Sequence, residues 1–134
     1  MFGKKGNAPV SKMESLIGVG TRIEGDVVFK GGLHIDGEVR GNISCENPQE
    51  GTLEISDKAN VEGSITVGHV VVNGTVTGPI FASHSLELMP QARVTGDVEY
   101  HQIEIHQGAV IQGRLVHQVQ TTSKTVELRL LGNT

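Results

Sequence analysis

Residues 23–27 read Ile-Glu-Gly-Asp-Val, and this apolar-x-Gly-x-apolar unit occurs six times along the 134-residue chain. The later copies lie at residues 39–43, 61–65, 76–80, 94–98 and 111–115. Their glycines follow one another at steps of 16, 22, 15, 18 and 17 residues. Self-similarity at such a spacing is typical of a solenoid, in which each repeat packs against its neighbours.

A second apolar alternation lies between most successive copies of this unit. It occurs at Leu33-His34-Ile35, Leu53-Glu54-Ile55, Val70-Val71-Val72, Leu86-Glu87-Leu88 and Ile103-Glu104-Ile105. Alternation with a period of two indicates strands with one buried face. At about 3.3 Å per residue, a repeat of about 17 residues closes a three-sided turn. We therefore predict an all-β, single-domain parallel β-helix of about six turns over residues 16–115, with flexible tails at residues 1–15 and 116–134.

The composition favours the same fold. The chain has eighteen Gly but only three Phe, one Tyr and no Trp, so its core must consist of stacked aliphatic side chains. Cys45 lies two residues after Ile43, which by strand parity places its thiol inside as a small buried hydrophobe. The longest glycine step contains residues 46–51, Glu-Asn-Pro-Gln-Glu-Gly, which we expect to form a loop at one corner.

The charge is unevenly distributed between the N-terminal tail and the rest of the chain. The net charge is −4, and because Lys4, Lys5 and Lys12 are the only charged residues before residue 14, the remainder carries −7. An acidic rod with few aromatic side chains argues against nucleic acid as a partner. The tip Met1, Phe2, Lys4 and Lys5 could instead insert two apolar side chains into an anionic membrane surface, although an incidental starter tail is the alternative. The segment is too short and polar for a signal peptide or a spanning helix.

The ends of the predicted rod carry the strongest mechanistic inference. A parallel β-helix leaves unpaired backbone groups at both ends, and no capping helix is evident in the sequence. We therefore predict end-to-end polymerisation into filaments. The residues expected at the contacts are Ile17, Val19, Ile23, Val27, Ile103, Ile105, Val110, Ile111 and Leu115.

The chain resembles the bactofilins, a family of bacterial cytoskeletal proteins. The Met1-Phe2 tip with its lysines and the glycine-marked turns, such as residues 39–43 and 94–98, carry the resemblance. It implies a right-handed triangular β-helix that forms nonpolar filaments without nucleotide or other cofactor. It also implies a cytoplasmic protein attached through this tip to the inner face of the cell membrane. There it would scaffold peptidoglycan synthases or hydrolases and influence cell shape or appendages.

Two rival hypotheses share the β-helix. The first is a hexapeptide-repeat acyltransferase or a γ-type carbonic anhydrase, in which His84, His101 and His106 would approach one metal ion. The glycine steps break multiples of six, and parity places His101 inside and His106 outside unless a corner intervenes. We therefore expect no enzyme and no metal site of this kind. The second rival is a monomeric adaptor with the same fold. No Gly-x-x-x-x-Gly-Lys-Ser/Thr nucleotide loop is present in the sequence.

Overall fold

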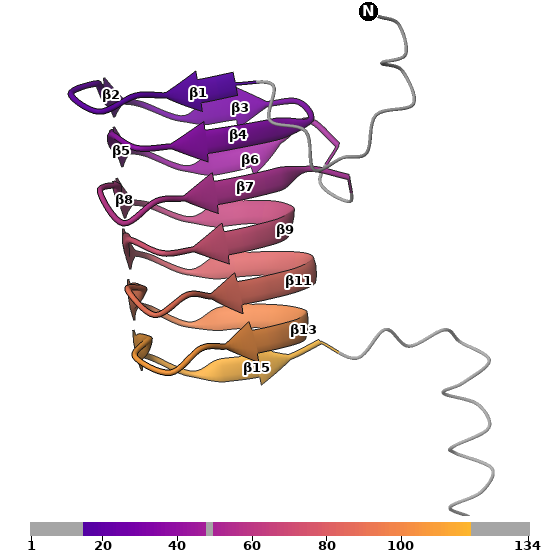
Figure 1. Cartoon of the computed structure of the whole chain (residues 1–134). Helices are drawn as coiled ribbons and strands as arrows, with labels where there is room; N and C mark the ends of the chain where they lie inside the picture. The colour runs from indigo at the N-terminus through magenta and orange to yellow at the C-terminus, as the bar shows by residue number, and fades with distance from the viewer. Residues whose placement is uncertain (1–14, 48–49, 119–134) are drawn as a thin grey trace, which may run out of the picture.

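The computed structural model describes residues 15–47 and 50–118, which form a stack of parallel strands without any helix among them (Figure 1). The stack runs from the indigo strands of the first turn to the yellow strand of the last. This confirms the predicted all-β parallel β-helix of about six turns. The strands are β1 Ser15–Ile17, β2 Arg22–Glu24, β3 Val27–Phe29, β4 Gly32–Ile35, β5 Glu38–Arg40, β6 Ile43–Cys45, β7 Thr52–Ile55, β8 Asn60–Glu62, β9 Ile65–Val72, β10 Thr75–Thr77, β11 Ile80–Leu88, β12 Arg93–Thr95, β13 Val98–Ile105, β14 Val110–Gln112 and β15 Leu115–His117.

One side of the rod is a six-stranded sheet in the order β14-β12-β10-β8-β5-β2. Its strands pair in parallel so that the first apolar residue of each repeated unit stacks on that of the next turn. This inner column consists of Ile23, Val39, Val61, Val76, Val94 and Ile111. One residue per turn therefore fills each level of this side.

The rest of the rod is a nine-stranded sheet that bends around a corner. In the first turns this sheet uses separate strands, whereas β9, β11 and β13 curve continuously around one edge of the stack (Figure 1). The register of β11 shifts between Ala82 and Ser85 at this bend. One inner column before the corner consists of Val27, Ile43, Ile65, Ile80, Val98 and Leu115. One inner column beyond it consists of Ile17, Ile35, Ile55, Val72, Leu88 and Ile105.

The core is aliphatic, as the composition predicts. Among the described residues no polar or charged side chain is buried. Cys45 is a buried free thiol in register with Phe29, which confirms its inward orientation. Many small interlocking side chains thus replace a few large ones.

The repeated glycines form a column at one corner, and from Gly41 onward there is no room there for a side chain. A Cβ atom on Gly63 would lie 2.1 Å from the carbonyl oxygen of Gly41 in the preceding turn, and Gly63 has a φ of 144°. Side chains that follow these glycines accept backbone hydrogen bonds from the next turn, as when Asn42 N–H donates to Asp26 Oδ1 at 2.9 Å. Pro79 occupies this exposed corner, where its lack of an N–H breaks no strand pairing.

The described strands reach Ser15 and His117, slightly beyond the span of 16–115 expected from the sequence. The insertion in the longest repeat lies between β6 and β7, and the register of Ile43 with Ile65 in the next turn is kept. Residues 1–14, 48–49 and 119–134 lie outside the described residues, and so do the predicted features that fall on them.

Candidate functional site

The two ends of the rod are the candidate sites of self-association. At one end β1, β2 and β3 each pair only with the following turn, and at the other β14, β15 and the last part of β13 pair only with the preceding turn. Within residues 15–47 and 50–118, no segment covers either set of edges. Each end therefore presents open strand edges, which are templates for pairing with another chain.

The inner columns lose their cover at the C-terminal end. Leu115 is 48% exposed, whereas Val98, directly paired with it one turn earlier, is 0% exposed. Ile105 is 47% exposed against 0% for its paired neighbour Leu88. Both side chains hold inward positions, and no further turn within residues 15–47 and 50–118 covers them.

The other C-terminal residues predicted at the contact are placed differently. Ile103 and Ile111 are half-buried against the core. Val110 is 39% exposed and pairs with Arg93, which is at an outward position, so Val110 does not extend an inner column. Instead Ala109, which was not among the predicted contact residues, packs against the core beside it.

The inward side chains of the first turn are less exposed than those of the last turn. Ile17 is buried, and Ile23 and Val27 are half-buried against the core. Val19 lies in the turn between β1 and β2, is 68% exposed and is not part of the core cluster. Phe29, which was not selected, is buried in the same first turn.

Three exposed apolar side chains at the ends were also not selected from the sequence. Leu16, Val28 and Val116 point outward on terminal strands, between inward residues. The signal that could have revealed them is an apolar residue at the polar position of an alternating strand. They widen the apolar surface at both ends of the rod.

The predicted membrane tip, Met1, Phe2, Lys4 and Lys5, lies outside the described residues. In the part of the chain that the structure describes, no helix is long and apolar enough to cross a bilayer.

The histidines do not form the three-imidazole metal site that was considered as an alternative. The ring of His84 stacks on His69 with a centroid separation of 5.0 Å, and that of His101 stacks on His117 at 6.2 Å. His106 instead contacts two glutamates. The exception to the parity argument applies at His101, because β13 turns a corner there, between inward Tyr100 and inward Ile103.

Two histidines have shifted pKa values. A hydrogen bond with Glu54, 3.0 Å from Nδ1, is the main cause that raises the pKa of His34. Burial opposes this rise, and Asp36, 3.1 Å from Nε2, raises the pKa further. Burial, together with the neighbouring His84, lowers the pKa of His69. These groups make the stability of the rod dependent on pH, without forming a catalytic arrangement.

Comparison with known proteins gives a consistent result. Residues 15–116 match the family model "Bactofilin: Polymer-forming cytoskeletal". The chain is similar to Bactofilin BacO of Myxococcus xanthus (strain DK1622), with 34% identity over 101 residues that cover 75% of this chain and 77% of the relative. It is also similar to Bactofilin BacP of the same organism, with 32% identity over 77 residues, 58% of this chain and 32% of that longer relative. No solved structure gives a significant match.

Proposed function

The chain belongs to the bactofilin family of polymer-forming cytoskeletal proteins, and from this premise we propose that it assembles end to end into nonpolar, nucleotide-independent filaments. We further propose that these filaments lie on the inner face of the cell membrane and scaffold peptidoglycan synthases or hydrolases. The family membership supports self-association and a structural role in place of catalysis.

The observation that carries end-to-end assembly is the exposure of inward side chains in the last turn. Leu115 and Ile105 each keep almost half of their surface exposed, although the same column positions one turn earlier are fully buried. A second rod placed on this end would bury these side chains and pair the open strand edges. Full burial of one such side chain is worth about 1.5–3 kcal/mol. Apolar burial and pairing of the open strand edges would thus both join rods along their axis.

Independence from nucleotide is supported by the use of the glycines. The repeated glycines follow one another turn by turn along the rod, and Gly63 packs against the backbone of Gly41 where a phosphate-binding loop would need open amide groups. The sequence also lacks a P-loop motif. Nonpolar order is supported by the resemblance to the family.

Attachment to the membrane rests on the sequence of the tip, Met1 to Lys5. One tip would bind weakly, with about 1 kcal/mol from each lysine near an anionic surface. A filament carries many tips, so the attachment becomes firm through avidity. Recruitment of cell-wall enzymes is proposed from the family resemblance.

Negative-stain electron microscopy of the purified full chain tests the assembly. The sample would contain EDTA and no nucleotide, at near-physiological salt. Long thin filaments are expected. Uniform particles of one chain would contradict the proposal and favour the monomeric adaptor, whereas uniform trimers would favour the enzyme class.

Flotation with anionic phosphatidylglycerol vesicles tests the membrane attachment. We expect the full chain to float and a variant lacking residues 1–5 to stay at the bottom of the gradient. Deletion of residues 130–134 removes the same number of residues from the other tail and should leave flotation unchanged. Equal flotation of the two deletion variants would refute the role of the tip.

A further inference from the structure

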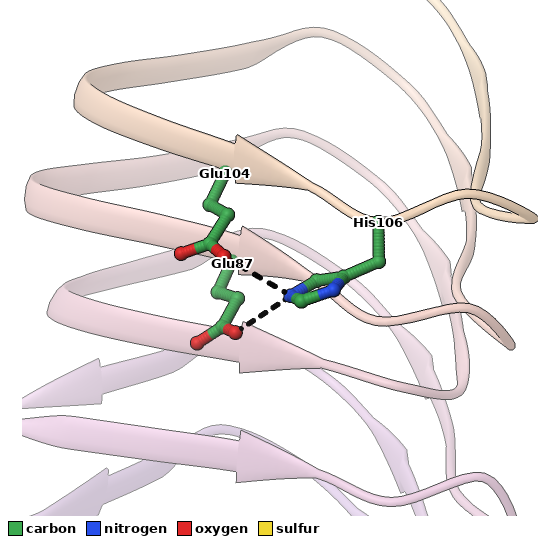
Figure 2. A group of neighbouring side chains, drawn as sticks. All are labelled: Glu87, Glu104 and His106. Atoms are coloured by element: carbon green, nitrogen blue, oxygen red, sulfur yellow. Dashed lines mark hydrogen bonds and ion pairs between the residues drawn. The ribbon is translucent and has the colours of Figure 1, made fainter.

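An acidic pair with a histidine lies on the outer surface of the last turns (Figure 2). Glu87 on β11 and Glu104 on β13 are directly paired across neighbouring turns, so their side chains leave the same face of the sheet. His106 directly follows β13, and its backbone N–H donates a hydrogen bond to the carbonyl of Leu88 at 2.9 Å. The backbone therefore holds all three side chains at one place.

The three side chains converge on a single point. His106 Nε2 lies 2.8 Å from Glu87 Oε2 and 3.4 Å from Glu104 Oε2 (Figure 2). A protonated Nε2 can direct its one N–H at only one of the two carboxylates, and an unprotonated Nε2 presents a lone pair to both. One imidazole nitrogen and two carboxylate oxygens that converge in this way form a ligand set found at zinc sites.

His34 provides the contrast on the same outer column, near the other end of the rod. It also contacts two carboxylates, but it uses Nδ1 for Glu54 at 3.0 Å and Nε2 for Asp36 at 3.1 Å. Each carboxylate there has its own ring nitrogen, so a protonated imidazole satisfies both. The ligand atoms at His34 therefore diverge around the ring, whereas those at His106 meet.

Charge compensation also bears on the pair Glu87 and Glu104. Some acidic side chains on the rod have arginine partners, such as Glu38 with Arg22 at 3.0 Å and Glu62 with Arg40 at 3.8 Å. Among the described residues, no lysine or arginine forms an ion pair with Glu87 or Glu104. Two like charges directly opposite each other on neighbouring strands repel. A bound cation would remove this repulsion.

We propose that Glu87, Glu104 and His106 bind a late first-row divalent cation, foremost Zn²⁺. An imidazole nitrogen with carboxylate oxygens suits Zn²⁺ better than Ca²⁺ or Mg²⁺, which prefer oxygen ligands alone. Tetrahedral ligands about 2.1 Å from Zn²⁺ lie about 3.4 Å apart. The three ligand atoms already lie within 4.8 Å of one another, and the exposed side chain of Glu104 can move to close the site. Water completes the coordination.

The cation would join the last turn to the one before it. On this side the final segment of β13 pairs only with β11, which makes it an open edge. A ligand from each strand and a third from the turn after β13 would fasten this edge. Zn²⁺ should therefore raise the melting temperature of the rod.

Equilibrium dialysis of the EDTA-treated, dialysed full chain against ZnCl₂ near pH 7.5 tests the site. We expect one saturable Zn²⁺ site per chain. It should weaken by about tenfold or more in Glu87→Gln and in His106→Gln, because each removes one of three ligands. The matched control is Glu54→Gln, which changes the glutamate beside His34 on the same outer column and should bind as the wild type does.

Thermal unfolding gives a second readout. Zn²⁺ should raise the melting temperature of the wild type and of Glu54→Gln, but not that of Glu87→Gln. The absence of saturable binding by the wild type would overturn the proposal. So would equal binding by Glu87→Gln, which would mean adventitious binding only, for example through the stacked pair His69 and His84. An equal loss in Glu54→Gln would reduce the effect to general surface charge and would also overturn the site.

Discussion

Replacing Leu115 by arginine should block contacts at the C-terminal end of the rod. The side chain of Leu115 is 48% exposed at an inward position. Covering that half in a filament contributes about 0.7–1.5 kcal/mol, taken as half of the value for full burial. A two-fold symmetric contact contains the residue twice, so the loss is about 1.5–3 kcal/mol, or about 10–150-fold in the dissociation constant. Two desolvated, unpaired cations at the same contact would add several kcal/mol.

The product of this substitution reports the polarity of the filament. In a nonpolar filament, C-terminal ends meet each other and N-terminal ends meet each other, so Leu115→Arg leaves the N-terminal contact intact. Light scattering after size-exclusion chromatography should then give dimers, twice the chain mass of 14.3 kDa. A second substitution at the other end, Ile23→Arg, should convert these dimers to monomers.

Two outcomes would refute this reasoning. Monomers from Leu115→Arg alone would mean that every contact uses both ends, which is head-to-tail order. Unchanged filaments in electron micrographs would mean that burial at this end does not drive assembly. Thr77→Arg is the matched control, because Thr77 is exposed in the middle of the rod and the same charge there should leave filaments intact.

Further predictions concern the stability of the rod. Gly63→Ala should lower the free energy of unfolding by about 1–3 kcal/mol in chemical denaturation, because Gly63 has a positive φ and contacts the backbone of the preceding turn. Gly25 has a similar φ but open space around it, so an equal loss in Gly25→Ala would contradict the explanation by close approach. His34 has a raised pKa, so its contribution is complete below the unfolded pKa of about 6.5 and is lost as the pH rises through the folded value. The melting temperature of the wild type should therefore exceed that of His34→Gln by more at about pH 6 than at about pH 8. The pKa of His69 is lowered, so the pH dependence of its contribution has the opposite sign. The wild type should lose stability relative to His69→Gln as the pH falls below about 6.5. Parallel profiles of melting temperature against pH for the two proteins would refute this contribution of His69.

The inner columns could be predicted from the sequence because each turn contributes one equivalent residue to each column. The two apolar residues of the repeated unit, such as Val39 and Ile43, occupy two different sides of the rod in every turn. The glycine between them marks the corner. A repeat that is regular in sequence thus becomes regular in space, even though its length varies.

The corner within β13 could not be predicted in the same way. Alternation shows which residues share a face but not where a continuous strand bends. Tyr100 and Ile103 both point inward although they differ by three residues, because the register shifts between them. Val110 shows the other limit of alternation, since an apolar residue can hold an outward position on a terminal strand.

The candidate cation site was partly visible in the sequence. Glu87 and Glu104 stand at the same place in two equivalent apolar alternations, so parallel stacking alone would pair them. The contribution of His106 depends on the turn after β13, which repeats the turns Ser56–Ala59 and Met89–Ala92 but is the only one of the three that begins with a histidine. The pairing of the two strand residues was thus predictable, whereas the direction of the His106 ring toward them was not.

Each turn contributes one residue to every inner column, so whole turns can be added or removed without changing the two ends of the rod. Residues 78–95 comprise one complete turn, from the glycine after β10 to the end of β12. Removing them would join Thr77 to Gly96, the equivalent glycine of the following turn, and the terminal strands would be unaltered. The subunit would shorten by about 4.8 Å, the spacing of neighbouring strands. Whole-turn gain or loss thus gives evolution, or a protein engineer, a way to adjust the axial repeat of a polymer in fixed increments while its joints stay the same.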